Sequence, residues 1–111
     1  LISATTAQEA ITVHYSELGG VIPGLGSYKS NPWGLAIEIR DHKQPHWTGT
    51  LNSPQTFGHF GGSGTMMWID PSISSGLIAL TDRNFDEWSA EALVAWPSLS
   101  DAVIQAMMNH A

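Results

Sequence analysis

One stretch of the chain decides the fold: Gly58-His59-Phe60-Gly61-Gly62-Ser63-Gly64-Thr65-Met66-Met67-Trp68-Ile69-Asp70-Pro71. Its first half is dense in glycine and leads into a short apolar run, residues 65–69, which ends at Asp70-Pro71. A second apolar run follows at residues 76–81. Short apolar runs bounded by glycine and proline are typical of strands, and a brief connection favours antiparallel pairing. The stretch therefore predicts a β-hairpin.

Towards the N-terminus, residues 33–40 alternate between apolar and other side chains, which is typical of a half-buried strand. The apolar face would carry Trp33, Leu35, Ile37 and Ile39, and the charged face would carry Glu38 and Arg40. Residues 41–57 are polar and broken by proline, so we predict a long connection with a short strand near residues 47–51. Residues 21–32 hold several glycines and prolines and are predicted to form a loop.

Helices are predicted before and after these strands. Residues 5–18 carry two overlapping capping boxes, followed by apolar residues at helical spacing. A second helix would begin at Asn84 or Asp86 and end at Pro97, and a third would follow from Ser98. An antiparallel sheet with helices packed on one side belongs to the α+β class.

Composition excludes several kinds of protein. The chain has 111 residues, which is enough for one domain but not for two. Its formal net charge of -6 leaves no basic surface for a nucleic acid or an anionic bilayer. The absence of Cys excludes disulfides, thiol nucleophiles and Cys-ligated zinc within the chain. No run approaches the roughly 20 apolar residues of a membrane span. From the charge we expect no nucleic-acid partner, and from the short apolar runs we expect no membrane span.

The chain opens at Leu1-Ile2-Ser3, with neither an initiator Met nor the basic and apolar stretches of a signal peptide. We expect it to be a piece of a longer protein. Such a piece can carry half of an active site, so a residue that this chain lacks could be supplied by the rest of the protein.

The glycine-dense segment Gly58–Gly64 is the best candidate for chemistry. Glycines let a ligand approach the main chain closely and leave N–H groups free to point at an anion or an oxyanion. His59 adds a titratable hydrogen-bond donor beside them. The segment is equally compatible with a glycine-rich turn that carries a surface histidine. It does not fit the phosphate-binding P-loop, the dinucleotide-binding fingerprint or the nucleophile elbow.

Three other features carry less weight. His42 and His46 are four residues apart, as two metal ligands on a helix would be, but Pro45 would break that helix. The run from Asp82 begins like a calcium loop but lacks the glycine and the glutamate that such a loop needs. We therefore expect no metal ion and no cofactor. Among the tryptophans, Trp47 in the long connection is the candidate for a substrate pocket, because the others fit a core better.

The stretch from Gly58 to Pro71, together with Trp33-Gly34-Leu35, resembles the C-terminal part of the serine hydrolases related to class C β-lactamases. That family also includes esterases and penicillin-binding D,D-peptidases. In it, a strand beside the active site carries a Lys-Thr-Gly box, which is often His-x-Gly in the esterase-like branch. His59-Phe60-Gly61 is similar to that box. The likeness extends from about Ile11 to Ile104.

The resemblance implies a fold and a set of site residues. The strand that carries the box would continue to Ile69, within the antiparallel sheet and flanking helices of the β-lactamase and penicillin-binding fold. The backbone N–H of Gly62 would complete the oxyanion hole. His59 and Gly62 would then be catalytic, and the substrate would be contacted by Phe60, Gly61 and Ser63. Trp47, chosen above for its place in the long connection, would be a further substrate contact.

The resemblance also implies acyl-enzyme chemistry, for which this chain lacks the nucleophile. The family uses a Ser-x-x-Lys box and a Tyr-x-Asn box, and neither occurs here. Acyl transfer needs an activated nucleophile. We therefore expect the N-terminal remainder of the same protein to be the partner that supplies both boxes.

Two departures from the family box bear on the substrate. A histidine is mostly neutral near neutral pH, whereas the lysine that it replaces is a cation, so His59 weakens the recognition of a carboxylate. Phe60 stands where the family has a threonine, whose hydroxyl would contact that carboxylate. We therefore expect a small-molecule substrate that is a carboxylic ester or amide, with a β-lactam or a D-Ala peptide still included.

Two alternatives stay open. The missing nucleophile would also suit a non-catalytic binding or interaction domain with a penicillin-binding-like fold. The chain could equally be a folding fragment whose sheet edge and apolar faces are covered by the rest of the protein, or by a second copy in a homo-oligomer.

Overall fold

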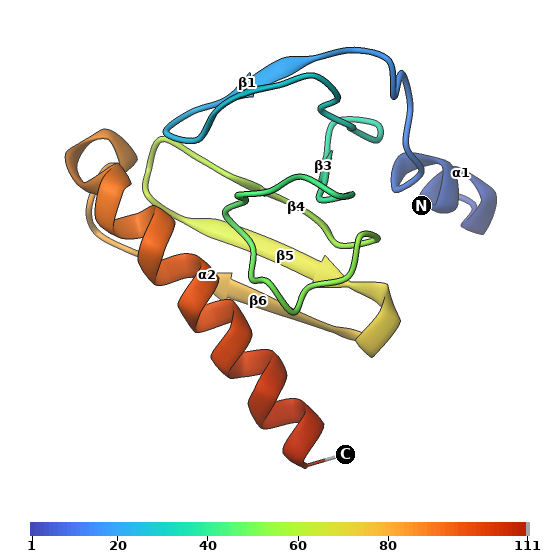
Figure 1. Ribbon diagram of the computed structural model, residues 1–111. Coiled ribbons are helices and arrows are strands. Elements are labelled where there is room, and N and C mark those ends of the chain that lie inside the picture. Colours follow the sequence, from blue (N-terminus) through green and yellow to red (C-terminus); the bar gives the residue numbers. More distant parts are fainter. Residues whose placement is uncertain (111) are drawn as a thin grey trace.

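The computed structural model describes residues 1–110 and has an α+β architecture (Figure 1). A four-stranded antiparallel sheet lies at its centre, in the order β3-β4-β5-β6. Helix α2 crosses one face of this sheet, and the β1–β2 hairpin lies above β3 and β4 in the view of Figure 1. No helix among residues 1–110 is long and apolar enough to cross a membrane. The elements are α1 (Ala4–Ala10), β1 (Gly20–Ile22), β2 (Gly26–Tyr28), β3 (Glu38–Ile39), β4 (Phe57–Phe60), β5 (Met66–Asp70), the 3-10 helix η1 (Pro71–Ile73), β6 (Ser75–Ala79) and α2 (Phe85–Asn109).

The predicted hairpin is confirmed by β5 and β6. The two strands pair from Met66 opposite Ala79 to Asp70 opposite Ser75. The Asp70 carboxylate accepts a hydrogen bond from the backbone N–H of Ser72 and so caps η1, which joins the strands. The local pattern was sufficient here because the apolar runs and the polar connection are all short.

The strand that carries His59 does not continue to Ile69, as the resemblance implied. Residues 61–64 reverse the chain, so β4 and β5 are separate antiparallel neighbours with Phe60 opposite Met66. The Gly64 N–H donates to the Gly61 carbonyl, and Gly64 has a φ of 81°. A left-handed glycine at the end of a short hairpin loop is the conformation that glycine permits at low cost.

The predicted strand over residues 33–40 is shortened to β3. The chain folds back on itself within this segment, since Trp33 bridges Glu38 and the Gly34 N–H donates to the Ile37 carbonyl. Ala36, between them, has a φ of 63°. Alternation of side chains predicted an extended run, but it does not report a tight turn inside the run.

Two further predictions for the first third of the chain were wrong. Residues 21–32 are not all loop, because Pro23-Gly24 forms the turn between β1 and β2, with Gly24 at a φ of 80°. Helix α1 ends at Ala10 instead of residue 18, and its N-cap is Ser3, whose hydroxyl accepts from the Thr6 N–H. The helix stops early because the following backbone pairs elsewhere, with His14 opposite Trp33. The strand expected near residues 47–51 is also absent from the described structure.

Pro97 does not end a helix, because α2 continues through it to Asn109. A single buried stripe explains this continuity: the residues four apart on the sheet-facing side are Ala92, Trp96, Ser100 and Ile104. The stripe packs against Trp68 on β5, which is fully buried. Packing of this apolar face outweighs the one main-chain hydrogen bond that a proline removes. The backbone departs from helical geometry at Trp88 instead.

The opposite face of the sheet is open in the described part of the chain. Side chains alternate along a strand, so β5 and β6 turn Met66, Trp68 and Leu77 towards α2 and the intervening residues away from it. Of the latter, Ile69 and Ile78 are exposed, and so is Leu80 just beyond β6. This face, beside the free edge of β6, is therefore one of the apolar surfaces of the described chain.

Candidate functional site

A cavity of about 620 Å³ lies at the end of β4, between the β1–β2 hairpin and the start of α2. Its walls are mainly apolar, with polar groups at a few points, as in typical small-molecule sites. The apolar lining consists of Val21, Ile22, Pro23, Trp33, Phe60 and Phe85. The polar lining consists of Asn31, Glu38, His59, Asn84 and Asp86, and the main chain of Gly61 and Gly62 completes it.

The backbone N–H of Gly62 points out of the turn between β4 and β5, and Gly62 is one of the residues that line the cavity. The peptide between Gly61 and Gly62 is planar, so its carbonyl and its N–H point in opposite directions. Because that carbonyl accepts from Gly64 inside the turn, the Gly62 N–H points outward. It has no main-chain acceptor among residues 1–110. The Gly62 carbonyl, by contrast, accepts from the Phe85 N–H at 2.9 Å, which ties the turn to the start of α2.

Strand alternation gives the same orientation. The Gly61 N–H donates to the carbonyl of Thr65, the residue before β5, so the main-chain groups of Phe60 face the other side. On that side β3 pairs only with Phe57 and Gly58, which leaves the end of β4 without a neighbouring strand. The cavity therefore adjoins an unpaired strand end that finishes with a free N–H group.

His59 and Phe60 contribute side chains of different kinds. The His59 side chain is exposed and forms a T-shaped pair with the Trp33 ring, with 5.8 Å between the ring centroids. The Phe60 ring is half-buried and packs on Phe85, with 4.9 Å between centroids, as well as on Trp96. His59 thus offers a titratable group to the cavity, and Phe60 joins the cavity wall to the core.

The structure brings together four of the six predicted site residues, His59, Phe60, Gly61 and Gly62. Ser63 is exposed at the tip of the turn, where its hydroxyl pairs with that of Thr65, and it does not line the cavity. Trp47 does not line it either, because its side chain is only 1% exposed. The expectation of Trp47 in a pocket is corrected: the irregular connection that carries it folds inward.

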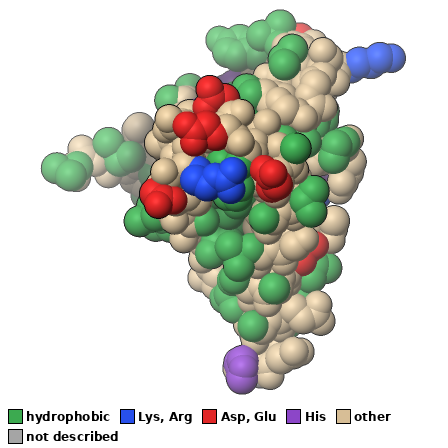
Figure 2. Space-filling model, turned by 90° about the vertical axis from the view of Figure 1, so that its left-hand side faces the viewer, with side chains coloured by type: hydrophobic (Ala, Val, Ile, Leu, Met, Phe, Trp, Pro, Cys, Tyr) green, Lys and Arg blue, Asp and Glu red, His purple; other side chains and the backbone are tan. Residues whose placement is uncertain are grey.

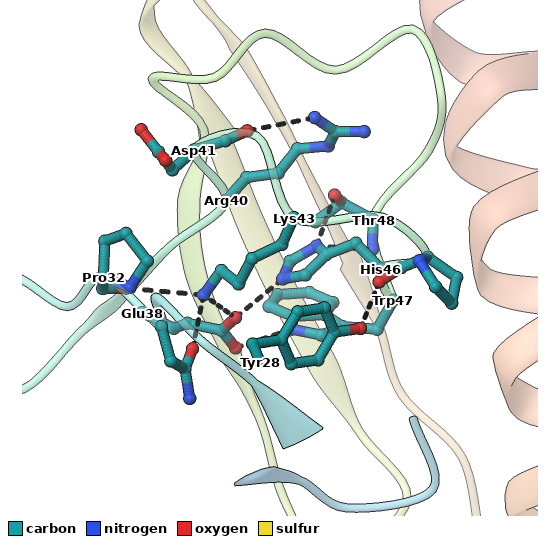
Figure 3. A network of polar contacts seen from close by, with 11 residues as sticks. Tyr28, Pro32, Glu38, Arg40, Asp41, Lys43, His46, Trp47 and Thr48 are labelled. Atoms are coloured by element: carbon teal, nitrogen blue, oxygen red, sulfur yellow. Dashed lines mark hydrogen bonds and ion pairs between the residues drawn. The ribbon is translucent and has the colours of Figure 1, made fainter. Parts of the chain in front are cut away.

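Behind the cavity lies a buried polar cluster centred on Glu38 (Figure 3). One carboxylate oxygen of Glu38 accepts from Lys43 Nζ at 2.5 Å and from His46 Nε2 at 2.7 Å. The other accepts from the indole N–H of Trp47 at 2.8 Å. Lys43 also donates to the side chain of Asn31 at 2.8 Å. The sequence placed Glu38 on a charged, outward face, but it is 4% exposed.

The ionisation of this cluster follows from burial and pairing. Burial alone would raise the pKa of Glu38, but the hydrogen bonds and charges of His46 and Lys43 outweigh it and hold the pKa below its usual value. Burial lowers the pKa of both Lys43 and His46, against the pull of Glu38. A neutral His46 donates from Nε2 to Glu38 and accepts the Thr48 hydroxyl at Nδ1, 2.8 Å away. Glu38 and Lys43 therefore form the charged pair.

Sequence reasoning missed Asn31, Glu38 and Asp86 as cavity residues. Asn31 lies in an irregular segment, and Glu38 lies on β3 just after a tight turn, so no local pattern reports that either side chain reaches the cavity. Asp86 was recognised only as a helix-capping candidate; its position directly after Phe85, which bonds to Gly62, could not be inferred from spacing. His42 is exposed and His46 is bound to Glu38, and no cluster of three metal-ligating side chains occurs in residues 1–110.

No protein-family model matches the chain, and no curated protein matches it significantly. Among solved structures it is similar to a β-lactamase from Mycobacterium bovis, with a TM-score of 0.88 and 48% sequence identity. The similarity covers 96% of this chain and 38% of that protein, so the chain spans well under half of its length. The chain is therefore similar, in sequence and in structure, to part of a β-lactamase-related hydrolase.

Proposed function

We propose that this chain forms part of the active site of a serine hydrolase that acts on a carboxylic ester or amide through an acyl-enzyme. In this site the Gly62 N–H stabilises the oxyanion of the tetrahedral intermediate, and His59 donates a hydrogen bond to the substrate or to a neighbouring catalytic group. Phe60 and Gly61 form the surface on which the substrate lies. A β-lactam or a D-Ala peptide belongs to the same reaction class.

The observation that carries the proposal is the free Gly62 N–H at the edge of a cavity that also contains His59. Stabilisation of an oxyanion requires a main-chain or side-chain donor whose direction is fixed before the reaction. The similarity to a β-lactamase supports the same reading. The nucleophile would come from the N-terminal remainder of the protein, because Ser-x-x-Lys and Tyr-x-Asn boxes are absent from this sequence.

The test uses the full-length protein and two replacements of one residue. Gly62→Pro removes the donor at a turn position that suits proline, whereas Gly62→Ala keeps it, and an added Cβ would meet no atom within 4 Å. We expect Gly62→Pro to lower kcat about 100-fold or more, as the loss of one oxyanion donor does. Gly62→Ala should lose much less. Equal activities of the two variants would overturn the assignment of Gly62.

The competing candidate is a non-catalytic binding domain, which the missing nucleophile favours. A fluorescent fluorophosphonate probe separates the two, since it labels only an activated serine. Covalent labelling of the full-length protein, seen as a mass increase, supports the hydrolase. An unlabelled protein that binds a ligand in the cavity supports the binding domain. In either case the open sheet face and the edge of β6 would be covered by the rest of the protein, or by a second copy.

A further inference from the structure

The charged groups that line the cavity are all acidic within residues 1–110. Glu38 and Asp86 contribute carboxylates, and no Lys or Arg side chain is part of the lining. The charge of Glu38 is already balanced by Lys43, and Lys43 and His46 both donate hydrogen bonds to one of its carboxylate oxygens. Asp86 is exposed and forms no ion pair with any described residue. Asp86 is therefore the uncompensated charge of the cavity.

Asp86 lies close to the candidate oxyanion donor. It belongs to the first turn of α2 and directly follows Phe85, whose N–H is bonded to the Gly62 carbonyl. The N-terminus of a helix carries a partial positive charge of roughly half a unit, which would favour an anion here. The full charges of Asp86 and Glu87 in the same turn exceed that partial charge. The net field at this end of the cavity is therefore negative.

The surface around this end of the cavity is also negatively charged. Residues 82–91 contain four acidic residues and one basic residue, Arg83. The Arg83 guanidinium lies over the Trp88 ring, 5.3 Å from its centroid. On the side of the molecule where the turn and the start of α2 lie, Figure 2 shows acidic side chains gathered around one basic side chain. Such a surface raises the local concentration of cations and disfavours anions.

Aromatic side chains form part of the same cavity wall. Trp33, which lines the cavity, is 37% exposed, and the Phe60 and Phe85 rings line it as well. The faces of aromatic rings attract ammonium groups, and tryptophan does so most strongly. An acidic group and aromatic rings around one apolar space form the chemistry that recognises an organic cation.

From this arrangement we propose that the cavity selects ester or amide substrates that carry an ammonium group, with Asp86 as the residue that determines this specificity. The inference rests on the proposed function and names its substrate class. A nearby carboxylate opposes the negative charge that develops on the oxyanion at Gly62. A substrate cation beside Asp86 removes that opposition, whereas a substrate carboxylate adds to it.

Three acetate esters of one shape test the proposal on the full-length protein. Acetylcholine carries the cation, a second ester has a tert-butyl group in its place, and a third has a carboxylate there. All three give the same acetyl-enzyme, so differences in kcat/KM report only binding and acylation. The wild-type protein should prefer the cationic ester to the anionic one. Asp86→Asn should reduce the ratio of the two kcat/KM values about two- to fivefold, the size expected for an exposed charge pair.

Glu87→Gln is the matched control, because Glu87 shares the first turn of α2 but does not line the cavity. Glu87→Gln removes the same charge farther from the substrate and should change the ratio much less than Asp86→Asn does. An equal effect of both variants would reduce Asp86 to a general surface charge and overturn the proposal. If the neutral ester is hydrolysed but Asp86→Asn leaves the ratio unaltered, the specificity is wrong while the hydrolase stands. If no ester is hydrolysed and the fluorophosphonate does not label the protein, the proposed function fails and the specificity fails with it.

Discussion

The indole N–H of Trp68 donates a hydrogen bond of 2.9 Å to the hydroxyl of Ser100, and both side chains are fully buried. This contact joins the central strand β5 to α2 across the core. The Ser100 hydroxyl also donates to the Trp96 carbonyl one turn earlier, at 2.8 Å. One buried hydroxyl thus serves as acceptor for the sheet and as donor within the helix.

Ser100→Ala should lower the free energy of unfolding by about 1–3 kcal/mol, because it leaves the Trp68 N–H buried without an acceptor. Urea unfolding followed by tryptophan fluorescence would measure the loss. Ser98→Ala is the matched control, since the Ser98 hydroxyl makes a similar bond to the Val94 carbonyl on the exposed side of α2. It should cost less than about 0.5 kcal/mol. Similar losses for the two serines would contradict the role of Ser100.

Gly64→Ala should distort the turn that orients Gly62. Its φ of 81° disfavours any side chain, and an added Cβ would lie 1.8 Å from the Arg83 carbonyl oxygen. Strain of this kind costs on the order of 1–3 kcal/mol before the clash is counted. Thermal unfolding would detect it, with Gly62→Ala as the sterically free comparison. A Gly64→Ala protein as stable as Gly62→Ala would show that this backbone conformation is not required.

Glu38→Gln should destabilise the protein by about 3–5 kcal/mol, because it leaves the buried Lys43 ammonium without a counter-ion. The double replacement Glu38→Gln with Lys43→Met removes both charges and should recover much of the loss. Chemical denaturation of the two single variants and the double variant forms a double-mutant cycle. Additive losses in that cycle would mean that the two residues do not act as a pair.

The protein should lose stability in mild acid. Burial lowers the pKa of His46 below its ordinary 6.5, so the unfolded chain takes up a proton that the folded chain does not. The contribution of His46 to the free energy of unfolding is therefore fully present above pH 6.5, and it is lost as the pH falls below that value. The depressed pKa of Glu38 adds a further loss in the more acidic range, with the same sign.

His46→Gln keeps a hydrogen-bond donor for Glu38 but removes this titration. The slope of stability against pH between about 6.5 and 5 should therefore flatten in the variant. His42→Gln, at an exposed position four residues away, is the comparison that should preserve the slope. A slope that persists in the His46 variant would assign the acid sensitivity to other groups.

Sequence reasoning succeeded where structure is local. The β5–β6 hairpin follows from two apolar runs and the turn at Asp70-Pro71, all within a few residues of one another. The Pro23-Gly24 pair carried an equally local signal for the turn between β1 and β2, and it was read as loop because glycine and proline were counted without regard to turn type. The four consecutive residues His59 to Gly62 line one cavity, and their roles in a site stay a prediction.

Predictions failed where distant segments decide the outcome. Glu38 is buried because Lys43, His46 and Trp47 supply donors from an irregular connection, and no alternation pattern reports such partners. Helix α2 passes through Pro97 because its buried stripe is held by β5, which a local breaker rule ignores. The prediction for Trp47 failed because its burial depends on how the long connection folds, and the sequence does not show that its ring turns inward.

The bond between the Gly64 N–H and the Gly61 carbonyl has a thermodynamic consequence for the cavity. It fixes the peptide that carries the Gly62 N–H within the turn, so that this donor is oriented before a ligand binds. A ligand oxyanion that binds there does not have to immobilise the loop, and the entropic penalty of ordering falls on the ligand alone. When the binding of a transition-state analogue is measured by calorimetry, the binding entropy should therefore contain no penalty for ordering this loop.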